Sequence, residues 1–328
     1  MLAIEMAREA GDGVGRQGKT PMFSKIRRSL LPETSASGSW RTWKWYLGNY
    51  IFILPFMILF AIFIFRPILA SLQMSFFRWE IFGPKPFIGF ENYDELLTDD
   101  LWWVALRNTV YFAFLTSALL TTVPIFIAIS LNTNIRGRNV FRTLFFFPYV
   151  LSASVVGLVI RWLLGQQFGI INYLLDSIGI GPIPFIADSD LVIPSLSVAT
   201  LWWGFGFPML IYLAGLSNIP QDIYEAARID GARGWQMTRY ITIPLLRPTI
   251  LFVAVTQLIS HFQVFAQPYV ITNGGPGQDS FTVIFYMFRA AWTYFRMGFA
   301  TAMAVLLAVI IMAFTLLQFR FGGRRLEY

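Results

Sequence analysis

The sequence contains no cysteine and only one histidine in 328 residues. Without cysteine the chain cannot form a disulfide, a thiolate nucleophile or a cysteine-ligated metal site. The single imidazole, His261, cannot build a zinc centre alone, and no cluster of Asp and Glu accompanies it. No Ser-His-Asp pattern and no pair of carboxylates within an apolar run is present. The sequence therefore predicts no catalytic residue and no metal ligand, and we do not expect an enzyme.

Charged residues are also scarce, at 13% of the chain against 56% hydrophobic residues. A soluble domain of average composition carries about 25% charged residues. Apolar runs account for the difference, because crossing a bilayer takes about 20 residues of low polarity. The runs long enough to cross are 49–65 (which continues towards residue 77), 109–131, 143–164, 191–216, 248–271 and 297–319. The predicted fold is an all-α membrane protein with six transmembrane helices.

The distribution of positive charge predicts how these spans are oriented in the lipid bilayer. Eighteen of the 25 Lys and Arg residues lie in alternate segments, namely the first 48 residues, 132–142, 217–247 and the C-terminal tail. Cytoplasmic loops of membrane proteins are enriched in Lys and Arg, so both termini are expected in the cytoplasm. The net charge of +7 then follows from topology, and no nucleic-acid partner is expected.

Residues 1–39 are rich in Gly, Ser, Lys and Arg and lack sustained periodicity, which predicts a disordered basic cytoplasmic tail. Residues 40–328 form the predicted transmembrane domain. Within the tail, residues 13–20 match the nucleotide-binding P-loop pattern literally. A working P-loop needs a strand before it and a helix after it. Since Pro21 follows directly and no β-rich run precedes, we interpret this match as chance.

Two further loops carry local structure of their own. Residues 91–106 have the pattern of one amphipathic helix ahead of the second span. The loop 165–190 is rich in Gly and Pro and predicts short interfacial helices.

The loop 217–247 is too polar to span a bilayer and opens like a helix. Pro220 is suited to a first turn, where its missing N–H has no cost, and Asp222 and Glu225 complement the helix dipole. Gly231 is suited to ending the helix. The pattern predicts a short helix across the cytoplasmic face, built to dock onto a partner. The alternative is an ordinary amphipathic helix that only connects two spans.

The fifth span carries polar residues at helical spacing. Gln257, Ser260, His261 and Val264 fall at i, i+3, i+4 and i+7, and we call them the polar stripe. Polar groups inside a membrane usually face a bundle interior or a watery cavity, which favours substrate contact. The alternative is hydrogen bonding between helices. Gln263 and Gln267 lie off the stripe and fit that alternative better. For His261 we prefer a neutral hydrogen-bonding role over a proton relay.

The fourth span carries a second set at the same spacing, which we call the aromatic stripe. Its members are Thr200, Trp203, Gly204 and Phe207. Flat rings against the apolar face of a sugar would complement the polar stripe, and Gly204 would leave room. Ordinary aromatic packing in a membrane core is the alternative.

The loop 217–247 resembles the cytoplasmic EAA loop of ABC-importer permeases. The residues that carry this resemblance are Ile219-Pro220, Tyr224-Glu225-Ala226-Ala227, Asp230-Gly231-Ala232, Trp235, Ile241-Thr242-Ile243-Pro244 and Pro248. A Gly-Gly-Pro turn at residues 272–277 follows the fifth span, as is typical of the carbohydrate-type members. The resemblance covers roughly residues 46–322. It implies a type I ABC importer permease (MetI-like) fold with a cytoplasmic EAA coupling helix.

The resemblance also implies site residues. ATPase coupling would fall to Tyr224, Glu225, Ala226, Ala227, Arg228, Asp230, Gly231 and Ala232. In the maltose-type member, the sugar-contacting positions fall on the equivalent faces of the fourth and fifth spans. The substrate pathway would therefore include Thr200, Trp203, Gly204, Phe207, Gln257, Ser260, His261 and Val264.

As implied by the resemblance, the chain is half of the pathway that carries a neutral sugar across a bacterial or archaeal cytoplasmic membrane. A second homologous permease, two copies of an ABC ATPase and an extracytoplasmic sugar-binding protein would complete the importer. The chain itself would bind no cofactor, because the ATPase holds ATP and magnesium. The alternatives are a permease for glycerol-phosphate, an amino acid or a peptide, or a membrane scaffold without transport. Spans four and five contain no basic residue, which favours a neutral solute.

Overall fold

The computed structural model describes residues 39–133 and 136–322. The predicted tail over 1–39 therefore lies outside the described residues except for Ser39, and the P-loop-like segment 13–20 lies outside them entirely. The chain divides into two compact units, residues 1–68 and 69–328, and each is described by itself. Within the described residues every regular element is a helix, accompanied by two isolated β-bridges.

The first unit contains α3 (Ser39–Phe60) and the π-helical turn η1 (Ala61–Phe65), and α4 (Arg66–Met74) begins in it. From Tyr50 to Met74 these elements form one continuous helix that is long and apolar enough to cross a membrane. Pro55 lies inside α3. Transmembrane helices tolerate such prolines, because local adjustments satisfy the freed backbone groups again.

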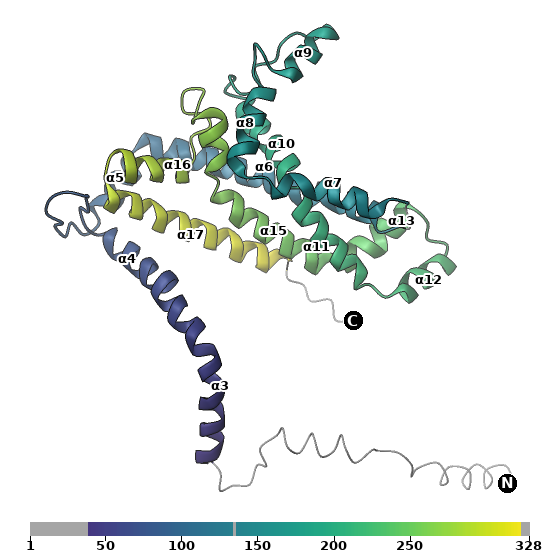
Figure 1. Ribbon diagram of the computed structural model, residues 1–328, viewed down its shortest axis with the longest axis horizontal. Coiled ribbons are helices and arrows are strands. Elements are labelled where there is room, and N and C mark those ends of the chain that lie inside the picture. Colours follow the sequence, from purple (N-terminus) through teal and green to yellow (C-terminus); the bar gives the residue numbers. More distant parts are fainter. Residues whose placement is uncertain (1–38, 134–135, 323–328) are drawn as a thin grey trace. The chain divides into compact units, whose positions relative to one another are not determined.

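Figure 1 labels most of the helices of the second unit. Its elements are α5 (Glu91–Thr98), α6 (Asp100–Leu131), α7 (Arg138–Val150), α8 (Ala153–Leu163), α9 (Ile170–Ser177), α10 (Val192–Gly204), α11 (Gly206–Ser217), α12 (Gln221–Ile229), α13 (Trp235–Met237), η2 (Thr238–Thr242), α14 (Ile243–Leu245), α15 (Arg247–Phe262), η3 (Pro268–Thr272), α16 (Val283–Phe288), η4 (Arg289–Thr293) and α17 (Met297–Gly322). Helix α15 packs against both α6 and α17.

Several of the predicted spans are bent rather than straight. By length and composition, three continuous helices can cross a membrane: Tyr50–Met74, Asp100–Leu131 and Met297–Arg320. Three more candidates are helix pairs with a sharp bend between them: α7 with α8 (96°), α10 with α11 (53°), and Trp235–Leu245 with α15 (69°). The described residues thus hold up to six spans, if each bent pair is one span.

The prediction of one helix over residues 91–106 is wrong, because Asp99 divides it. The backbone of Asp99 is extended, and its carboxylate accepts the N–H of Leu101 at 2.9 Å. An aspartate in this position is a favourable N-cap, so α6 starts at Asp100 as a separate helix.

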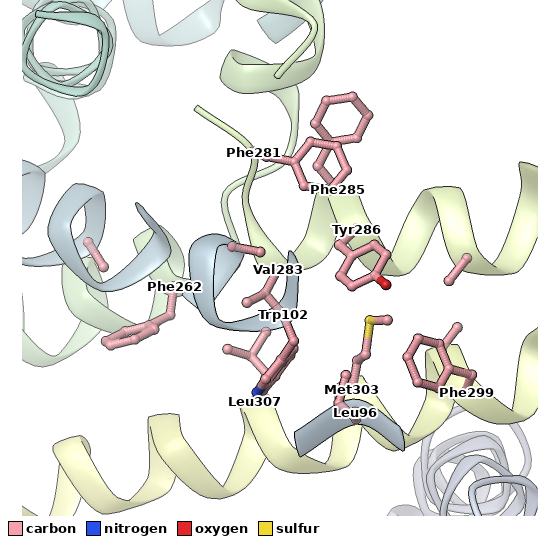
Figure 2. Packing of buried hydrophobic residues seen from close by; sticks show 14 of the residues in the cluster. Leu96, Trp102, Phe262, Phe281, Val283, Phe285, Tyr286, Phe299, Met303 and Leu307 are labelled. Carbon is pink, nitrogen blue, oxygen red and sulfur yellow. The ribbon is translucent and has the colours of Figure 1, made fainter. Parts of the chain in front are cut away.

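The packed interior is formed where α5, α6, α16 and α17 meet. Figure 2 shows Leu96, Trp102, Met303 and Leu307 gathered in this cluster, and all four are almost fully buried. In lipid, such contacts stabilise mainly through close packing and dispersion.

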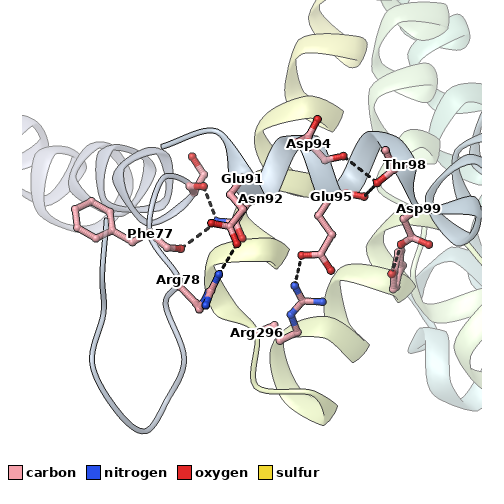
Figure 3. Close-up of polar contacts among 11 residues, drawn as sticks. Phe77, Arg78, Glu91, Asn92, Asp94, Glu95, Thr98, Asp99 and Arg296 are labelled. Carbon is pink, nitrogen blue, oxygen red and sulfur yellow. Dashed lines mark hydrogen bonds and ion pairs between the residues drawn. The ribbon is translucent and has the colours of Figure 1, made fainter. Parts of the chain in front are cut away.

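A polar clasp joins the segments around α5 (Figure 3). Asn92 is buried, and its Nδ2 donates to the carbonyl oxygens of Ser75 at 2.8 Å and Phe77 at 3.0 Å. Ion pairs join Arg78 to Glu91 and Arg296 to Glu95. The hydrogen bond to Glu95 raises the pKa of Arg296 above its ordinary value. The clasp therefore holds the residues after α4 and the start of α17 against α5.

Candidate functional site

The helix predicted in the loop 217–247 is α12, between α11 and α13. Pro220 is its N-cap residue and precedes the first turn, so its predicted position inside that turn is wrong by one residue. Asp222 lies in the first turn and Arg228 in the last. Each charge is opposite in sign to the partial charge at its end of the helix, which stabilises the helix.

The end of α12 agrees with the sequence prediction for Gly231. The backbone of Gly231 has φ +86°, and its N–H donates to the carbonyl of Arg228 at 3.1 Å. The N–H of Ala232 donates to the carbonyl of Ala227 at 2.9 Å. These two bonds form a Schellman motif, which satisfies carbonyls that a helix end otherwise leaves free.

One face of α12 is tied to the rest of the second unit and the other is free. Ala227 is buried, and the hydroxyl of Tyr224 lies 3.4 Å from Oγ1 of Thr242. Beyond the helix, the ring of Trp235 stacks on Phe126 with centroids 6.3 Å apart. The remaining predicted coupling residues are exposed or partly exposed: Glu225, Ala226, Arg228, Asp230, Gly231 and Ala232. Within the described residues, neither Glu225 nor Arg228 forms an ion pair, so both charges are available to a partner.

A cavity of about 870 Å³ lies beside α12, towards the end of α6. Tyr224, Glu225 and Arg228 line it together with Arg138 and Arg233. The three arginines against one carboxylate give this cavity a positive balance.

A second cavity, of about 400 Å³, brings together all eight residues of the aromatic and polar stripes. We call it the central cavity. Its other lining residues are Leu120, Tyr149, Thr256, Gln263, Phe265, Ala266 and Gln267. The fourth and fifth spans thus face one space, as the helical spacing predicted.

Two predictions about this cavity need correction. Gln263 and Gln267 line it, although their spacing placed them off the polar stripe. The reason is that α15 ends at Phe262, so helical spacing no longer describes the chain beyond it. Val264 also lies past the helix end, and it lines the cavity as well.

Sequence reasoning missed Tyr149, which reaches the cavity from the third span. It lies near the end of α7, just before the 96° bend at residues 151–152. The available signal was Pro148, since a proline inside an apolar run often marks a bend.

The polar atoms of the central cavity fall into two groups. Some are used inside the protein: Trp203 Nε1 donates to the Leu151 carbonyl at 3.2 Å, and Thr200 Oγ1 donates to the Leu196 carbonyl at 2.7 Å. His261 Nδ1 lies 2.7 Å from the Gln257 carbonyl oxygen, which leaves Nε2 free. The side chains that form no hydrogen bond within the described residues are those of Tyr149, Gln257, Ser260, Gln263 and Gln267.

The central cavity is thus rich in amides and hydroxyls, and none of its lining residues among those described is Asp, Glu, Lys or Arg. The described residues also contain no group of three or more His, Cys, Asp or Glu that could hold a metal ion. The arrangement suits hydrogen bonding to an uncharged polar molecule rather than bond cleavage.

Bent spans around an uncharged polar cavity, with a polar helix outside the spans, define a multi-pass membrane transport protein. The chain belongs to the family of binding-protein-dependent transport system inner membrane components, whose profile matches residues 120–326.

Similar proteins agree with this assignment. The chain is 36% identical over 293 residues to the probable ABC transporter permease protein YesP of Bacillus subtilis, covering 86% of this chain and 92% of YesP. It is 30% identical over 298 residues to AraP, an arabinooligosaccharides transport system permease of Bacillus subtilis (89% and 95% covered). It is 31% identical over 281 residues to UgpA, an sn-glycerol-3-phosphate transport system permease of Agrobacterium fabrum (85% and 96% covered).

A solved structure matches the fold. A chain of a bacterial ABC transporter that imports the acidic polysaccharide alginate superposes with a TM-score of 0.77 at 26% identity, covering 88% of this chain and 99% of that chain. The predicted all-helical ABC-importer permease fold is confirmed. The protein is therefore a multi-pass inner-membrane permease of a binding-protein-dependent ABC importer. Permease subunits of this kind are not catalytic and bind no cofactor, and the ATPase is a separate subunit.

Proposed function

We propose that this permease carries a neutral sugar, as a mono-, di- or oligosaccharide, through the central cavity. The observation that carries the proposal is the combination of free amides and free hydroxyls with aromatic rings in a cavity whose described lining residues include no charged side chain. Sugar hydroxyls need donors and acceptors of this kind, and sugar C–H faces match aromatic rings. A cavity of about 400 Å³ is also in the range of small-molecule sites.

The printed names of the similar proteins support a carbohydrate substrate but differ in the substrate they give. AraP is named for arabinooligosaccharides, whereas UgpA is named for sn-glycerol-3-phosphate and the alginate transporter for an acidic polysaccharide. An anionic solute inside a membrane protein needs a nearby cation to offset its desolvation. Because no Lys or Arg lines the central cavity among the described residues, a neutral sugar fits this chain better than glycerol-phosphate. Amino acids and peptides carry charged ends and fit less well for the same reason.

The same proposal covers the partners and the orientation. A second homologous permease completes the pathway, two ATPase subunits bind the loops that contain α12, and an extracytoplasmic sugar-binding protein delivers the substrate. Both termini, and with them residues 1–39, lie in the cytoplasm, because the basic segments 132–142 and 217–247 lie on that side. The exposed residues Glu225 and Arg228 contact the ATPase, while Tyr224 and Ala227 hold α12 to the permease.

The direct test is uptake by membrane vesicles that contain the whole importer. Radiolabelled neutral sugars, glycerol-3-phosphate and an amino acid are offered with and without ATP. ATP-dependent accumulation of one neutral sugar is the expected result. Accumulation of glycerol-3-phosphate alone, or of no solute by an intact complex, would overturn the proposed substrate class.

The coupling role of α12 is tested by Glu225→Lys. This change reverses one exposed charge without touching the buried face of the helix. We expect the variant to insert normally but to lose most of its co-purifying ATPase. The matched control is Asp94→Lys, an exposed acid on α5 that forms no ion pair in the described residues. Full ATPase recovery and normal uptake with Glu225→Lys would contradict the assignment.

A further inference from the structure

The cavity of about 870 Å³ beside α12 collects positive charge from three separate segments, and we call it the basic cavity. Arg138 comes from the start of α7, Arg228 from the last turn of α12, and Arg233 from the segment between α12 and α13. Within the described residues none of these guanidinium groups forms an ion pair, and the only acidic residue that lines the cavity is Glu225. Guanidinium groups bind phosphate oxygens through parallel hydrogen bonds, so this arrangement indicates an anionic ligand.

The start of α7 adds to the positive potential of the basic cavity. Arg138 is the first residue of α7, which is 13 residues long, and no side chain caps that end. The N-terminal end of a helix carries a partial positive charge and free N–H groups, which favour a bound phosphate. One turn further along α7, Nε of Arg142 is buried without a hydrogen-bond partner among the described residues, although Arg142 does not line the cavity. The α7 side of the cavity therefore carries positive charge that no ion pair within the described residues neutralises.

The size and the remaining lining of the basic cavity indicate which kind of anion fits. Its volume of about 870 Å³ exceeds what a bare phosphate needs, and it lies within the range of small-molecule sites. Side chains that can form hydrogen bonds, those of Asn132, Gln221 and Thr238, line the cavity together with the apolar side chains of Leu216 and Met237. The lining thus suits a phosphate group attached to a larger organic body.

The basic cavity also connects elements that are separate in the sequence. Its described walls come from the end of α6, the start of α7, helix α12 and η2. Arg138 and Arg233 lie outside α12, whereas the charges proposed to contact the ATPase lie on it. A ligand that binds both of these arginines therefore links α7 to the segment that ends α12.

We propose that the basic cavity is a binding site for an organic phosphate, whose phosphate group is held by Arg138 and Arg233 with Arg228 beside them. A phosphorylated metabolite and the headgroup of an anionic phospholipid share this chemistry, and basic pockets between spans on the cytoplasmic side bind such headgroups. The position of the cavity on the cytoplasmic side rests on the proposed orientation. Binding itself depends neither on that orientation nor on the transported solute, so a failure of sugar uptake leaves this inference untouched.

The test uses a cysteine reporter, which the cysteine-free chain permits. Gln221 lines the basic cavity, and the neighbouring Asp222 is exposed but does not line it. Gln221→Cys and the control Asp222→Cys are introduced singly into the full-length chain in phosphatidylcholine nanodiscs, where both faces are accessible. The rate of modification by a small uncharged maleimide is then measured. Glucose 6-phosphate is titrated in one arm, and phosphatidylglycerol replaces part of the phosphatidylcholine in the other.

Occupation of the basic cavity is expected to slow modification at position 221 roughly 3- to 10-fold near saturation, by mass action, and to leave position 222 unchanged. Protection by glucose 6-phosphate supports the site and identifies a soluble ligand. Protection by phosphatidylglycerol alone supports the site and identifies a lipid headgroup. Modification rates at position 221 that neither probe changes would overturn the inference.

Arginine variants distinguish a built site from general attraction to a basic face. Arg138→Gln together with Arg233→Gln is expected to raise the half-protecting amount of the active probe at least about 10-fold, because two charged hydrogen-bonding groups are lost. The matched control is Arg136→Gln together with Arg239→Gln, which removes two exposed arginines from the same two loops that do not line the cavity. Equal effects of the two pairs would overturn the site. Arg138→Gln alone is expected to weaken protection less but in the same direction, which keeps the test decisive if the double variant does not fold.

Discussion

Asn108 shows how one polar side chain supports irregular backbone in a membrane protein. It is buried in α6, and its Nδ2 donates to the carbonyls of Gln278 at 2.9 Å and Phe281 at 3.1 Å. The neighbouring Thr109 accepts the N–H of Val283 through Oγ1 at 2.9 Å. Non-helical backbone inside a membrane protein must find such partners, because lipid offers none.

Replacing Asn108 by Leu should therefore destabilise the permease. Two hydrogen bonds are lost, and the Phe281 carbonyl stays buried without the donor that Asn108 supplies, at a cost of roughly 2–4 kcal/mol. The measurement is the apparent unfolding temperature in detergent, which we expect to fall by about 5–10 °C. Asn132→Leu is the control, since Asn132 is exposed at the end of α6. Equal unfolding temperatures for the two variants would contradict this role of Asn108.

At the scale of elements, the breaks between helices were harder to predict than the helices themselves. The stripe residues within α10 and α15 were predictable, because i, i+3, i+4 spacing holds wherever a helix is regular. Phe207 lies beyond the 53° bend and Val264 beyond the end of α15, so regular spacing does not explain their places. The end of α15 at Phe262 was not predictable, since no proline or glycine stands there and Pro268 follows only later. For that reason Gln263 and Gln267 were wrongly placed away from the cavity that the polar stripe lines.

The end of α12, by contrast, could be predicted from a single residue, Gly231. A Cβ atom at Gly231 would meet nothing within 4 Å, so only the backbone conformation at φ +86° selects glycine there. Side chains disfavour this left-handed region by roughly 1–2 kcal/mol, and asparagine tolerates it best.

We therefore expect Gly231→Val to fray the last turn of α12 and Gly231→Asn to leave it nearly intact. Hydrogen exchange of the α12 amides measures this directly. Uptake and ATPase recovery should decline together in the valine variant if the helix end positions the docking face. Unchanged protection of α12 in Gly231→Val would show that the Schellman motif is dispensable.

At the scale of the whole molecule, the six-span topology depends on each bent pair crossing the membrane once. Length and composition allow six spans only if α7 with α8, α10 with α11, and Trp235–Leu245 with α15 each count once. The alternation of basic segments along the chain requires that count, because 132–142 and 217–247 then share one side. A re-entrant α7–α8 pair would instead leave the loop 165–190 on the same side as 132–142.

Single cysteines in the cysteine-free chain distinguish these arrangements. The exposed positions Asp94, Arg136, Asp176 and Asp222 sample four successive segments between spans. A membrane-impermeant maleimide applied to intact cells should label Asp94→Cys and Asp176→Cys, whereas inverted vesicles should expose Arg136→Cys and Asp222→Cys. If Asp176→Cys is labelled only together with Arg136→Cys, the 96° bend is a re-entrant turn and the six-span topology is wrong. Because the central cavity is framed by these same bends, that outcome would also move Tyr149 out of a membrane-crossing span.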